Sequence, residues 1–144
     1  MDSFRYYLAG GMSNLSHEEM RNWREVVIDK IENITSMGDI AVYPVYFNPV
    51  EYYNQFEDFH KNEREPFEYD LYNLRKSDLV IVNFNSPNSI GTAMEVAIAR
   101  ENRIPIVGLN EHDYNLHPWL VESCVRICDT MDELVNYVTD YFLY

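Results

Sequence analysis

Residues 78–95 read DLVIVNFNSPNSIGTAME and join an apolar segment to a polar turn and then to the start of a predicted helix. The apolar segment, from Leu79 to Phe84, has the length and composition of a buried strand. Glu95 is expected in the first turn of the helix. In open α/β sheets, small molecules bind between the carboxyl end of a strand and the amino end of the next helix. The segment therefore predicts a small-molecule site, with Glu95 as its leading candidate.

Strands and helices alternate along the rest of the chain. Strands are predicted at residues 4–9, 40–43 (closed by Pro44), 104–109 and 125–128. Helices are predicted from Ser16 to Gly38, from Pro66 onward with Phe67, Leu71 and Leu74 on one face, at 92–101, and at 131–142, with a short helical turn at 116–122. Such alternation favours a parallel sheet with helices on both faces, and right-handed crossovers favour a flavodoxin-like strand order. We therefore expect one α/β domain over residues 1–144, a doubly wound, Rossmann-like parallel sheet of about five strands.

Charge and hydropathy exclude several classes of protein. The formal net charge of -13 would repel a nucleic acid polymer, although it leaves room for a single nucleoside or nucleotide. No apolar run is long enough to span a membrane, and the first residues do not form a signal peptide. We expect the chain to be cytoplasmic.

Metal binding is not expected from the cysteines or the histidines. Cys124 and Cys128 lack the spacing of a redox pair or a zinc ribbon, and the four histidines are scattered. Strand alternation would place both cysteines on one face, as small buried apolar residues.

Two carboxylates could carry chemistry, Glu95 and Asp70. The partial positive charge of a helix amino end would keep Glu95 ionised, and an ionised carboxylate can attack a sugar carbon while a second acid protonates the leaving group. The alternative is that Glu95 only stabilises its helix and that Asp70 is a solvated helix residue.

Two polar clusters follow neighbouring strands. Gly10 and Gly11 end the first strand, where they form either a simple turn or a place of close approach to a ligand. Residues 85–89 supply amide and hydroxyl groups after the central strand. Loops at adjacent strand ends converge, so these clusters can line one crevice.

Three segments together resemble the signatures of the nucleoside 2-deoxyribosyltransferases. They are YLAGGMS at residues 7–13, Asp70-Leu71 followed by KSDLV at 76–80, and GTAMEVA at 91–97. Residues 102–109 resemble that family's next strand. The match covers most of the chain and preserves the order of the segments.

The resemblance implies a double displacement without a cofactor. Glu95 would attack C1′ of a 2′-deoxynucleoside, Asp70 would protonate the departing base, and Tyr7 would orient the nucleophile. A second free nucleobase would then capture the sugar. The residues implied in substrate binding are Gly10, Gly11, Met12, Ser89, Gly91, Asn115 and Tyr144.

Four of these residues bear on specificity and assembly. Ser89 stands where many transferases carry an Asp that holds the sugar 5′-hydroxyl, and it is similar to the phosphate-binding serines of 2′-deoxynucleoside 5′-monophosphate N-glycosidases. Met12 replaces an aromatic residue, which leaves the base preference open. Asn115 and the terminal Tyr144 resemble residues that enter a neighbouring subunit's site, which implies a homodimer or a higher homo-oligomer.

Other readings remain open. A hydrolase of deoxynucleoside monophosphates is favoured by Ser89 and disfavoured by the absence of an Arg or Lys cluster near Gly10. A non-catalytic nucleotide-binding module would not need both Asp70 and Glu95. The lysine-decarboxylase-like phosphoribohydrolases carry Pro-Gly-Gly where this chain has Pro-Asn-Ser at 87–89. The aromatic segment 45–65 could form a lid or a subunit contact.

Overall fold

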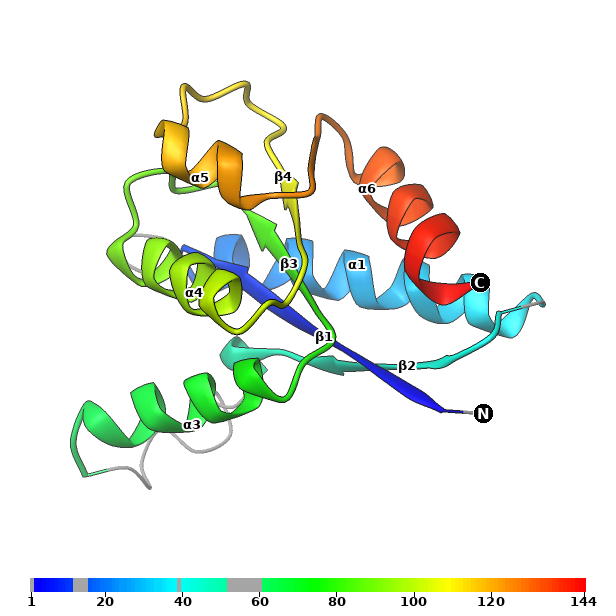
Figure 1. Cartoon of the computed structure of the whole chain (residues 1–144), viewed down its shortest axis with the longest axis horizontal. Coiled ribbons are helices and arrows are strands. Elements are labelled where there is room, and N and C mark those ends of the chain that lie inside the picture. Colours follow the sequence, from blue (N-terminus) through cyan, green and yellow to red (C-terminus); the bar gives the residue numbers. More distant parts are fainter. Residues whose placement is uncertain (1, 12–15, 39, 52–60) are drawn as a thin grey trace.

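The computed structural model describes residues 2–11, 16–38, 40–51 and 61–144. A five-stranded parallel sheet of order β2-β1-β3-β4-β5 lies at its centre (Figure 1). The predicted flavodoxin-like fold is confirmed. In chain order the elements are β1 (Ser3–Gly10), α1 (His17–Ser36), β2 (Tyr43–Phe47), α3 (Arg64–Arg75), β3 (Leu79–Asn83), α4 (Ile90–Glu101), β4 (Ile106–Leu109), α5 (Pro118–Ser123), β5 (Arg126–Cys128), α6 (Met131–Val138) and a π-helical turn (Thr139–Leu143).

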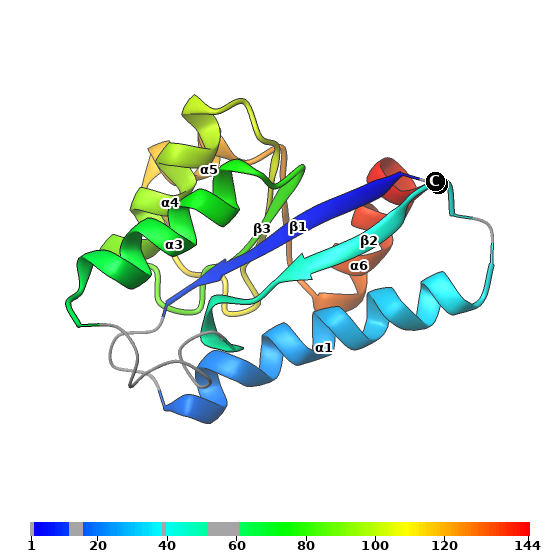
Figure 2. The same ribbon diagram turned by 90° about the horizontal axis from the view of Figure 1, so that it is seen from below.

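Helices cover both faces of the sheet. Figure 2 shows α1 and α6 on one side of β1 and β3, and α3 and α4 on the other. Alternate strand residues therefore enter two separate cores. Leu8 and Ile81 pack towards α1 and α6, whereas Tyr7 and Val80 pack towards α3 and α4. This double coverage explains why the central strand reads as a continuous apolar run.

Helix α1 begins where its capping residues predict. The Ser16 hydroxyl accepts a hydrogen bond from the Glu19 amide at 3.1 Å, and the Glu19 carboxylate accepts one from the Ser16 amide at 3.2 Å. This reciprocal pair satisfies two amides that the first turn of a helix leaves unbonded. The predicted stripe then buries Trp23, Val27 and Ile31 against the sheet.

The second strand lies further along the chain than predicted. Pro44 was expected to end a strand over 40–43, but it lies inside β2, paired in register with Phe4. Because β2 is an edge strand, the missing amide of a proline leaves no neighbouring strand unpaired. Ile40 is buried in the core as part of the connection that precedes the strand.

Two helical predictions need correction. Phe67 was expected on the buried face of α3, but it is 44% exposed because the first turn of α3 projects past the sheet (Figure 1). The terminal helix was expected to continue to Phe142, but α6 ends at Val138 and a π-helical turn follows. This turn buries Leu143 fully in the core, whereas Phe142 packs against the same core and is only partly buried.

The cysteines do not share a face of a strand. Cys124 precedes β5 and packs partly buried with the core under α3 and α4. Cys128, inside β5, is fully buried in the core under α1 and α6. The shared-face prediction was wrong because β5 begins only at Arg126.

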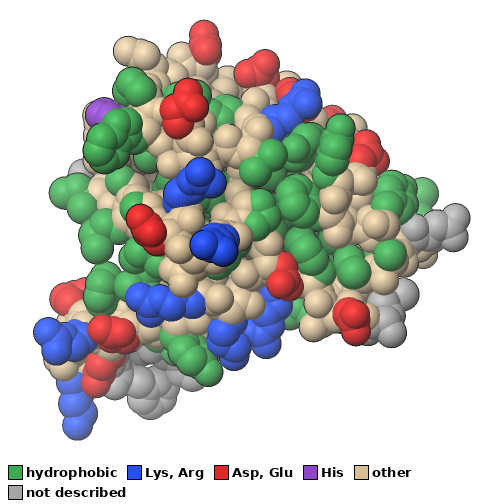
Figure 3. Space-filling model, in the orientation of Figure 1, with side chains coloured by type: hydrophobic (Ala, Val, Ile, Leu, Met, Phe, Trp, Pro, Cys, Tyr) green, Lys and Arg blue, Asp and Glu red, His purple; other side chains and the backbone are tan. Residues whose placement is uncertain are grey.

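Charge is unevenly spread over the surface. On the face in Figure 3, Lys and Arg side chains gather around α3, although the chain carries a net charge of -13.

Among the described residues, no helix combines the length and the apolar character that crossing a bilayer requires.

Candidate active site

The glycine pair that ends β1 and the polar turn that follows β3 lie side by side. Gly10, the last residue of β1, pairs in register with Asn83 at the end of β3. Beyond these residues the two loops touch, because Gly11 lies directly against Ser86. The two loops therefore meet at the carboxyl ends of neighbouring strands, the position where doubly wound sheets bind ligands.

Protein packing accounts for both glycines of this loop. A Cβ atom on Gly10 would lie 2.8 Å from the Trp23 ring, and one on Gly11 would lie 2.4 Å from the Cβ of Ser86. Neither position has room for a side chain. Close packing of protein against protein is sufficient reason for glycine at both positions, and their role in substrate binding stays a prediction.

A Gly11→Ala substitution is expected to destabilise the fold. The clash with Ser86 would force the two loops apart, and overpacking of this kind costs about 1–3 kcal/mol. Chemical denaturation measures the loss. Ser86→Gly in the Gly11→Ala background should recover part of it, because it removes the clashing atom. If the double variant loses the full sum of the two single effects, the contact does not constrain the loop.

Glu95 lies one turn deeper in its helix than predicted. Helix α4 begins at Ile90, because Ser89 serves as its N-cap and accepts a hydrogen bond from the Thr92 amide at 3.3 Å. Glu95 is therefore in the second turn, where the free amides of the helix end do not reach it. The helix amino end therefore does not keep Glu95 ionised as predicted, and other groups must stabilise its carboxylate.

Tyr7 is the first of these partners. The fully buried Tyr7 hydroxyl donates a 2.5 Å hydrogen bond to Oε2 of Glu95. Burial, with the charges of Glu95 and Asp70, holds the pKa of Tyr7 well above its ordinary value. The phenol therefore stays protonated and remains a donor at neutral pH. This is the geometry that the resemblance implied for an orienting tyrosine.

The carboxyl group of Glu95 has an altered acidity. Burial raises its pKa from 4.5 to about 7, against the lowering effects of the Tyr7 hydrogen bond and the charge of Arg24. The charge of Asp70 adds to the rise, so the two carboxylates are close enough to interact. Helix α3 contributes Asp70, which is only 8% exposed. Asp70 is thus not the solvated helix residue of the alternative reading.

Arg24 is a member of this group that sequence reasoning missed. It is 0% exposed, and its charge acts on Glu95. The signal was present in the sequence, because Arg24 lies between Trp23 and Val27 on a helix whose other residues at this spacing are apolar. A charge at a core position needs a partner, and here the partners are in the candidate site.

An aromatic wall stands beside the carboxylates. The ring of Tyr7 stacks on Phe47 at 5.4 Å and 20°, and Phe47 contacts Tyr69 at 5.7 Å. Tyr69 precedes Asp70 in α3 and is 41% exposed. The three rings come from β1, β2 and α3. The partly exposed ring of Tyr69 can stack on a planar ligand.

The turn before α4 contains polar groups whose hydrogen-bonding capacity is not fully used within the described residues. The Oδ1 atom of Asn85 is buried and accepts no hydrogen bond from the residues that the structure describes. Ser89 accepts hydrogen bonds from Thr92 yet keeps its own hydroxyl proton to donate. Gly91 faces open space, since no atom would lie within 4 Å of an added Cβ.

The remaining predicted site residues lie elsewhere. Asn115 is exposed in the loop between β4 and α5. Tyr144 is 63% exposed and lines a hollow with Met37 and Ile40, at the far end of α1 from the site. Both were expected to act in a partner's pocket, which stays a prediction. Met12 lies outside the described residues.

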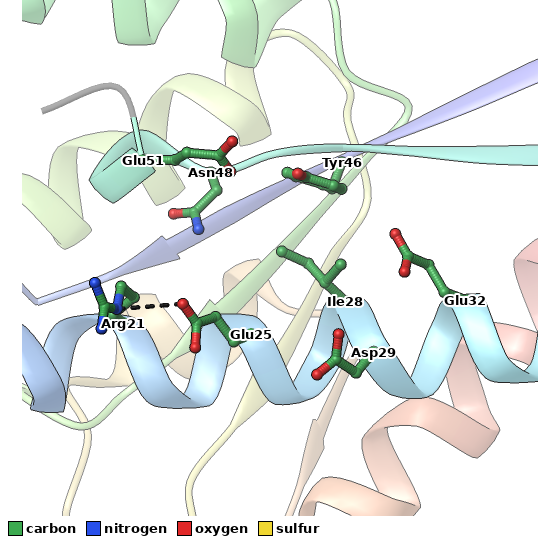
Figure 4. A pocket seen from close by; sticks show the side chains of 8 residues that line it. All are labelled: Arg21, Glu25, Ile28, Asp29, Glu32, Tyr46, Asn48 and Glu51. Carbon is green, nitrogen blue, oxygen red and sulfur yellow. Dashed lines mark ion pairs between the residues drawn. The ribbon is translucent and has the colours of Figure 1, made fainter. Parts of the chain in front are cut away.

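Two further hollows lie outside this group. Figure 4 shows one of about 600 Å³ between α1 and β2, with Glu25, Asp29, Glu32 and Glu51 on its walls and an ion pair of 3.2 Å between Arg21 and Glu25. The other, of about 470 Å³, runs between α4 and α5, is mainly apolar and adjoins the candidate site, because Ser89 is among its lining residues. Across the described ranges, no three His, Cys, Asp or Glu residues are grouped so that they could hold a metal ion.

Comparisons with known proteins agree on the fold. No protein-family model and no curated protein matches the sequence. Among solved structures, the 2-deoxyribosyltransferase of Bacillus psychrosaccharolyticus superposes with a TM-score of 0.72 at 17% identity, over 92% of this chain and 91% of that one. A CMP N-glycosidase from Clostridium botulinum gives a TM-score of 0.63 at 17% identity, over 96% and 99%.

A third similar structure carries no stated activity. It is a conserved protein from Enterococcus faecalis V583, with a TM-score of 0.72 at 14% identity over 96% of this chain and 98% of that one. At sequence identities this low, the superpositions establish a shared fold and nothing further. The resemblance to the nucleoside 2-deoxyribosyltransferases seen in the sequence motifs is therefore confirmed in the fold, which this chain shares along nearly its whole length with a 2-deoxyribosyltransferase and a CMP N-glycosidase.

Proposed function

We propose that the protein is a nucleoside 2-deoxyribosyltransferase, which moves deoxyribose between nucleobases through an ester on Glu95. The observation that carries the proposal is the 2.5 Å hydrogen bond from Tyr7 to Glu95 with the buried Asp70 beside it. A carboxylate oriented by a phenol can act as the nucleophile, and a second acid can protonate the leaving group, which are the two roles needed to break an N-glycosidic bond.

In the first step an oxygen of ionised Glu95 attacks C1′ of the deoxynucleoside. The bond between C1′ and the base nitrogen breaks, its electron pair leaves with the base, and Asp70 donates a proton to the base. The products are a deoxyribosyl ester on Glu95, a free base and the Asp70 carboxylate.

In the second step another base takes the place of the first. The Asp70 carboxylate removes a proton from the incoming base, whose nitrogen attacks C1′ and displaces Glu95 as a carboxylate. Both residues return to their starting states, so neither oxidant nor cofactor is required. Water in place of the base would give hydrolysis instead.

The environment of Glu95 fits a nucleophile of this kind. Since burial raises its pKa to about 7, the carboxyl group is partly ionised at neutral pH and poorly solvated. Tyr7 fixes one oxygen, which leaves the other free to attack. A binding module without catalysis gives no reason to retain a poorly solvated Glu95 beside a second, buried acid.

The test is chromatography of two incubations. The first contains thymidine or deoxyinosine with free adenine, and the second contains deoxynucleoside 5′-monophosphates without an acceptor base. New deoxyadenosine in the first incubation is the expected result. If the nucleosides are bound yet stay intact in both incubations, the protein is a binding module and the proposal fails.

A second candidate function is the hydrolysis of 2′-deoxynucleoside 5′-monophosphates. It is favoured by Ser89, a neutral donor at the amino end of α4, where backbone amides and the helix dipole suit an anion. The burial of Arg24 argues against this function. This cation lies beside Gly10, but it is fully buried and donates to backbone carbonyls, so it is not available to bind a phosphate. Free base and deoxyribose 5-phosphate in the second incubation alone would establish it.

A Ser89→Asp substitution separates these two functions. If a 5′-phosphate lies at this position, the added negative charge should raise the Kd for a monophosphate at least about tenfold, which corresponds to about 1.4 kcal/mol. Helix α4 should be preserved, because Asp is as good an N-cap as Ser. Ser89→Asn is the control, since it also caps but is neutral. Equal monophosphate affinity in both variants would place the phosphate elsewhere, or show that none binds.

A further inference from the structure

Arg24 is a completely buried cation that donates hydrogen bonds to two backbone carbonyls. Its side chain is 0% exposed, Nε donates to the Leu8 carbonyl, and Nη2 donates to the Gly10 carbonyl, both at 3.3 Å. The guanidinium also lies 4.7 Å from the centre of the Trp23 ring. The two carbonyls accept hydrogen bonds from the guanidinium and the Trp23 ring lies close to it, but none of them carries a net negative charge. A buried charge is costly unless an opposite charge is near.

The shape of the sheet brings this charge to the candidate site. The pairing of β1 with β2 ends at Tyr7 and Phe47, whereas β1 continues to Gly10. Along this stretch, which pairs with β3 but not with β2, the carbonyls of Leu8 and Gly10 accept hydrogen bonds from Arg24. The guanidinium, which comes from α1 on one side of the sheet, thus lies at the open edge of β1 and acts across to the other side, where Tyr7, Asp70 and Glu95 are found.

The electrostatic coupling runs in both directions. Burial lowers the pKa of Arg24 to about 10, and the charges of Glu95, Tyr7 and Asp70 oppose this fall, so Arg24 stays positive at neutral pH. Its charge in turn lowers the pKa of Glu95, as the Tyr7 hydrogen bond does, against burial and the charge of Asp70. Within the part of the chain that the structure describes, the charged and titratable groups that act on Glu95 are therefore Tyr7 from β1, Asp70 from α3 and Arg24 from α1.

We propose that Arg24 is a positioning residue, which fastens the end of β1 that carries Tyr7 and whose buried charge keeps Glu95 in its ionised, nucleophilic form. The inference rests on the proposed function for the role of Glu95 as nucleophile. Its electrostatic part concerns only these side chains and can be tested without any assay of activity.

The experiment is a carbon-13 NMR titration of the Glu95 carboxyl group in protein labelled at its glutamates. The signal is assigned by its absence from Glu95→Gln. In Arg24→Met, which keeps the length of the chain but loses the charge, the midpoint should rise by about one pH unit or more, as expected when an opposite charge is removed. Arg24→Lys keeps the charge and should move the midpoint by much less.

Arg21→Met is the matched control. Arg21 lies on the same helix, pairs with Glu25 at the surface and does not act on Glu95, so its loss should leave the midpoint in place. Where the protein turns over substrate, the acid limb of the pH–rate profile should move with the NMR midpoint. A folded Arg24→Met with an unmoved midpoint would overturn the proposal and leave Arg24 a purely structural fastener.

A second measurement covers the case in which Arg24→Met does not fold. Glu95→Gln is then added, and thermal unfolding is followed at pH 8.5. Because it removes the carboxylate that has lost its compensating charge, Glu95→Gln should restore to Arg24→Met the cooperative unfolding transition that the single variant lacks. A double variant that still fails to fold would also overturn the proposal.

The two levels of inference can fail separately. If neither base exchange nor hydrolysis is observed but the midpoint rises in Arg24→Met, the proposed function fails and the coupling stands. If base exchange is observed and the midpoint does not move, the function stands and the role of Arg24 fails.

Discussion

Glu95→Gln should abolish base exchange, with a fall in rate of at least about a thousandfold, because the amide cannot form the deoxyribosyl ester. The substitution keeps the shape of the side chain and its capacity to accept the Tyr7 hydrogen bond. Chromatography of the thymidine and adenine incubation measures the loss. Activity within tenfold of the wild type would sink the assignment of Glu95 as nucleophile.

The same variant should be more stable than the wild type at pH 8. The pKa of Glu95 is 4.5 in the unfolded reference and about 7 in the fold, so the folded protein holds a proton that the unfolded chain releases. The stability contributed by this proton is complete below pH 4.5 and is lost as the pH rises through about 7. Glutamine carries no such dependence, so its advantage in Tm should appear between these values and then level off.

Glu101→Gln is the matched control for both readouts. It removes a carboxylate from the same helix at an exposed position. Rate and Tm should both stay close to those of the wild type. If the Glu101 variant gains as much stability at pH 8 as the Glu95 variant, the gain reflects the net charge of the protein rather than burial at the site.

Asp70→Asn should lower the rate by about 10²–10⁴-fold, because the amide can neither give a proton to the departing base nor take one from the incoming base. Steady-state rates with thymidine and adenine measure the loss.

The leaving group provides a sharper version of this test. A deoxyribosyl substrate with a 4-nitrophenolate leaving group needs no proton on departure, so Asp70→Asn should slow formation of the ester much less with it than with a nucleoside. Glu68→Gln, an exposed carboxylate on α3, is the control and should be silent. An equal loss on both substrates would show that Asp70 is not the acid.

The fold was largely predictable because its signals are local. The apolar run of β3, the capping box at Ser16 and the alternation of strands with helices all follow from short-range periodicity. The failures occurred where tertiary position overrides a local rule. Pro44 reads as a strand end, and only its place at the sheet edge makes it acceptable inside β2.

The candidate site was predictable in its residues but not in its electrostatics. Glu95, Asp70 and Tyr7 are separated by long stretches of chain, and the motifs placed them in one site through resemblance. The acidity of Glu95 could not be read in this way, because it depends on burial and on Arg24, which reaches the site around the end of β1 from the other face of the sheet. A sequence shows that a charge interrupts an apolar stripe, but not which charge lies opposite.

The contact between Gly11 and Ser86 has a consequence for the evolution of the chain. The two residues are 75 positions apart, yet each limits the volume available to the other, because a single added carbon on Gly11 lies 2.4 Å from the Cβ of Ser86. In an alignment of homologues, these positions should therefore change together, with any larger residue at one accompanied by glycine at the other. Such covariation would mark the junction of the two loops even in relatives whose catalytic residues have been lost.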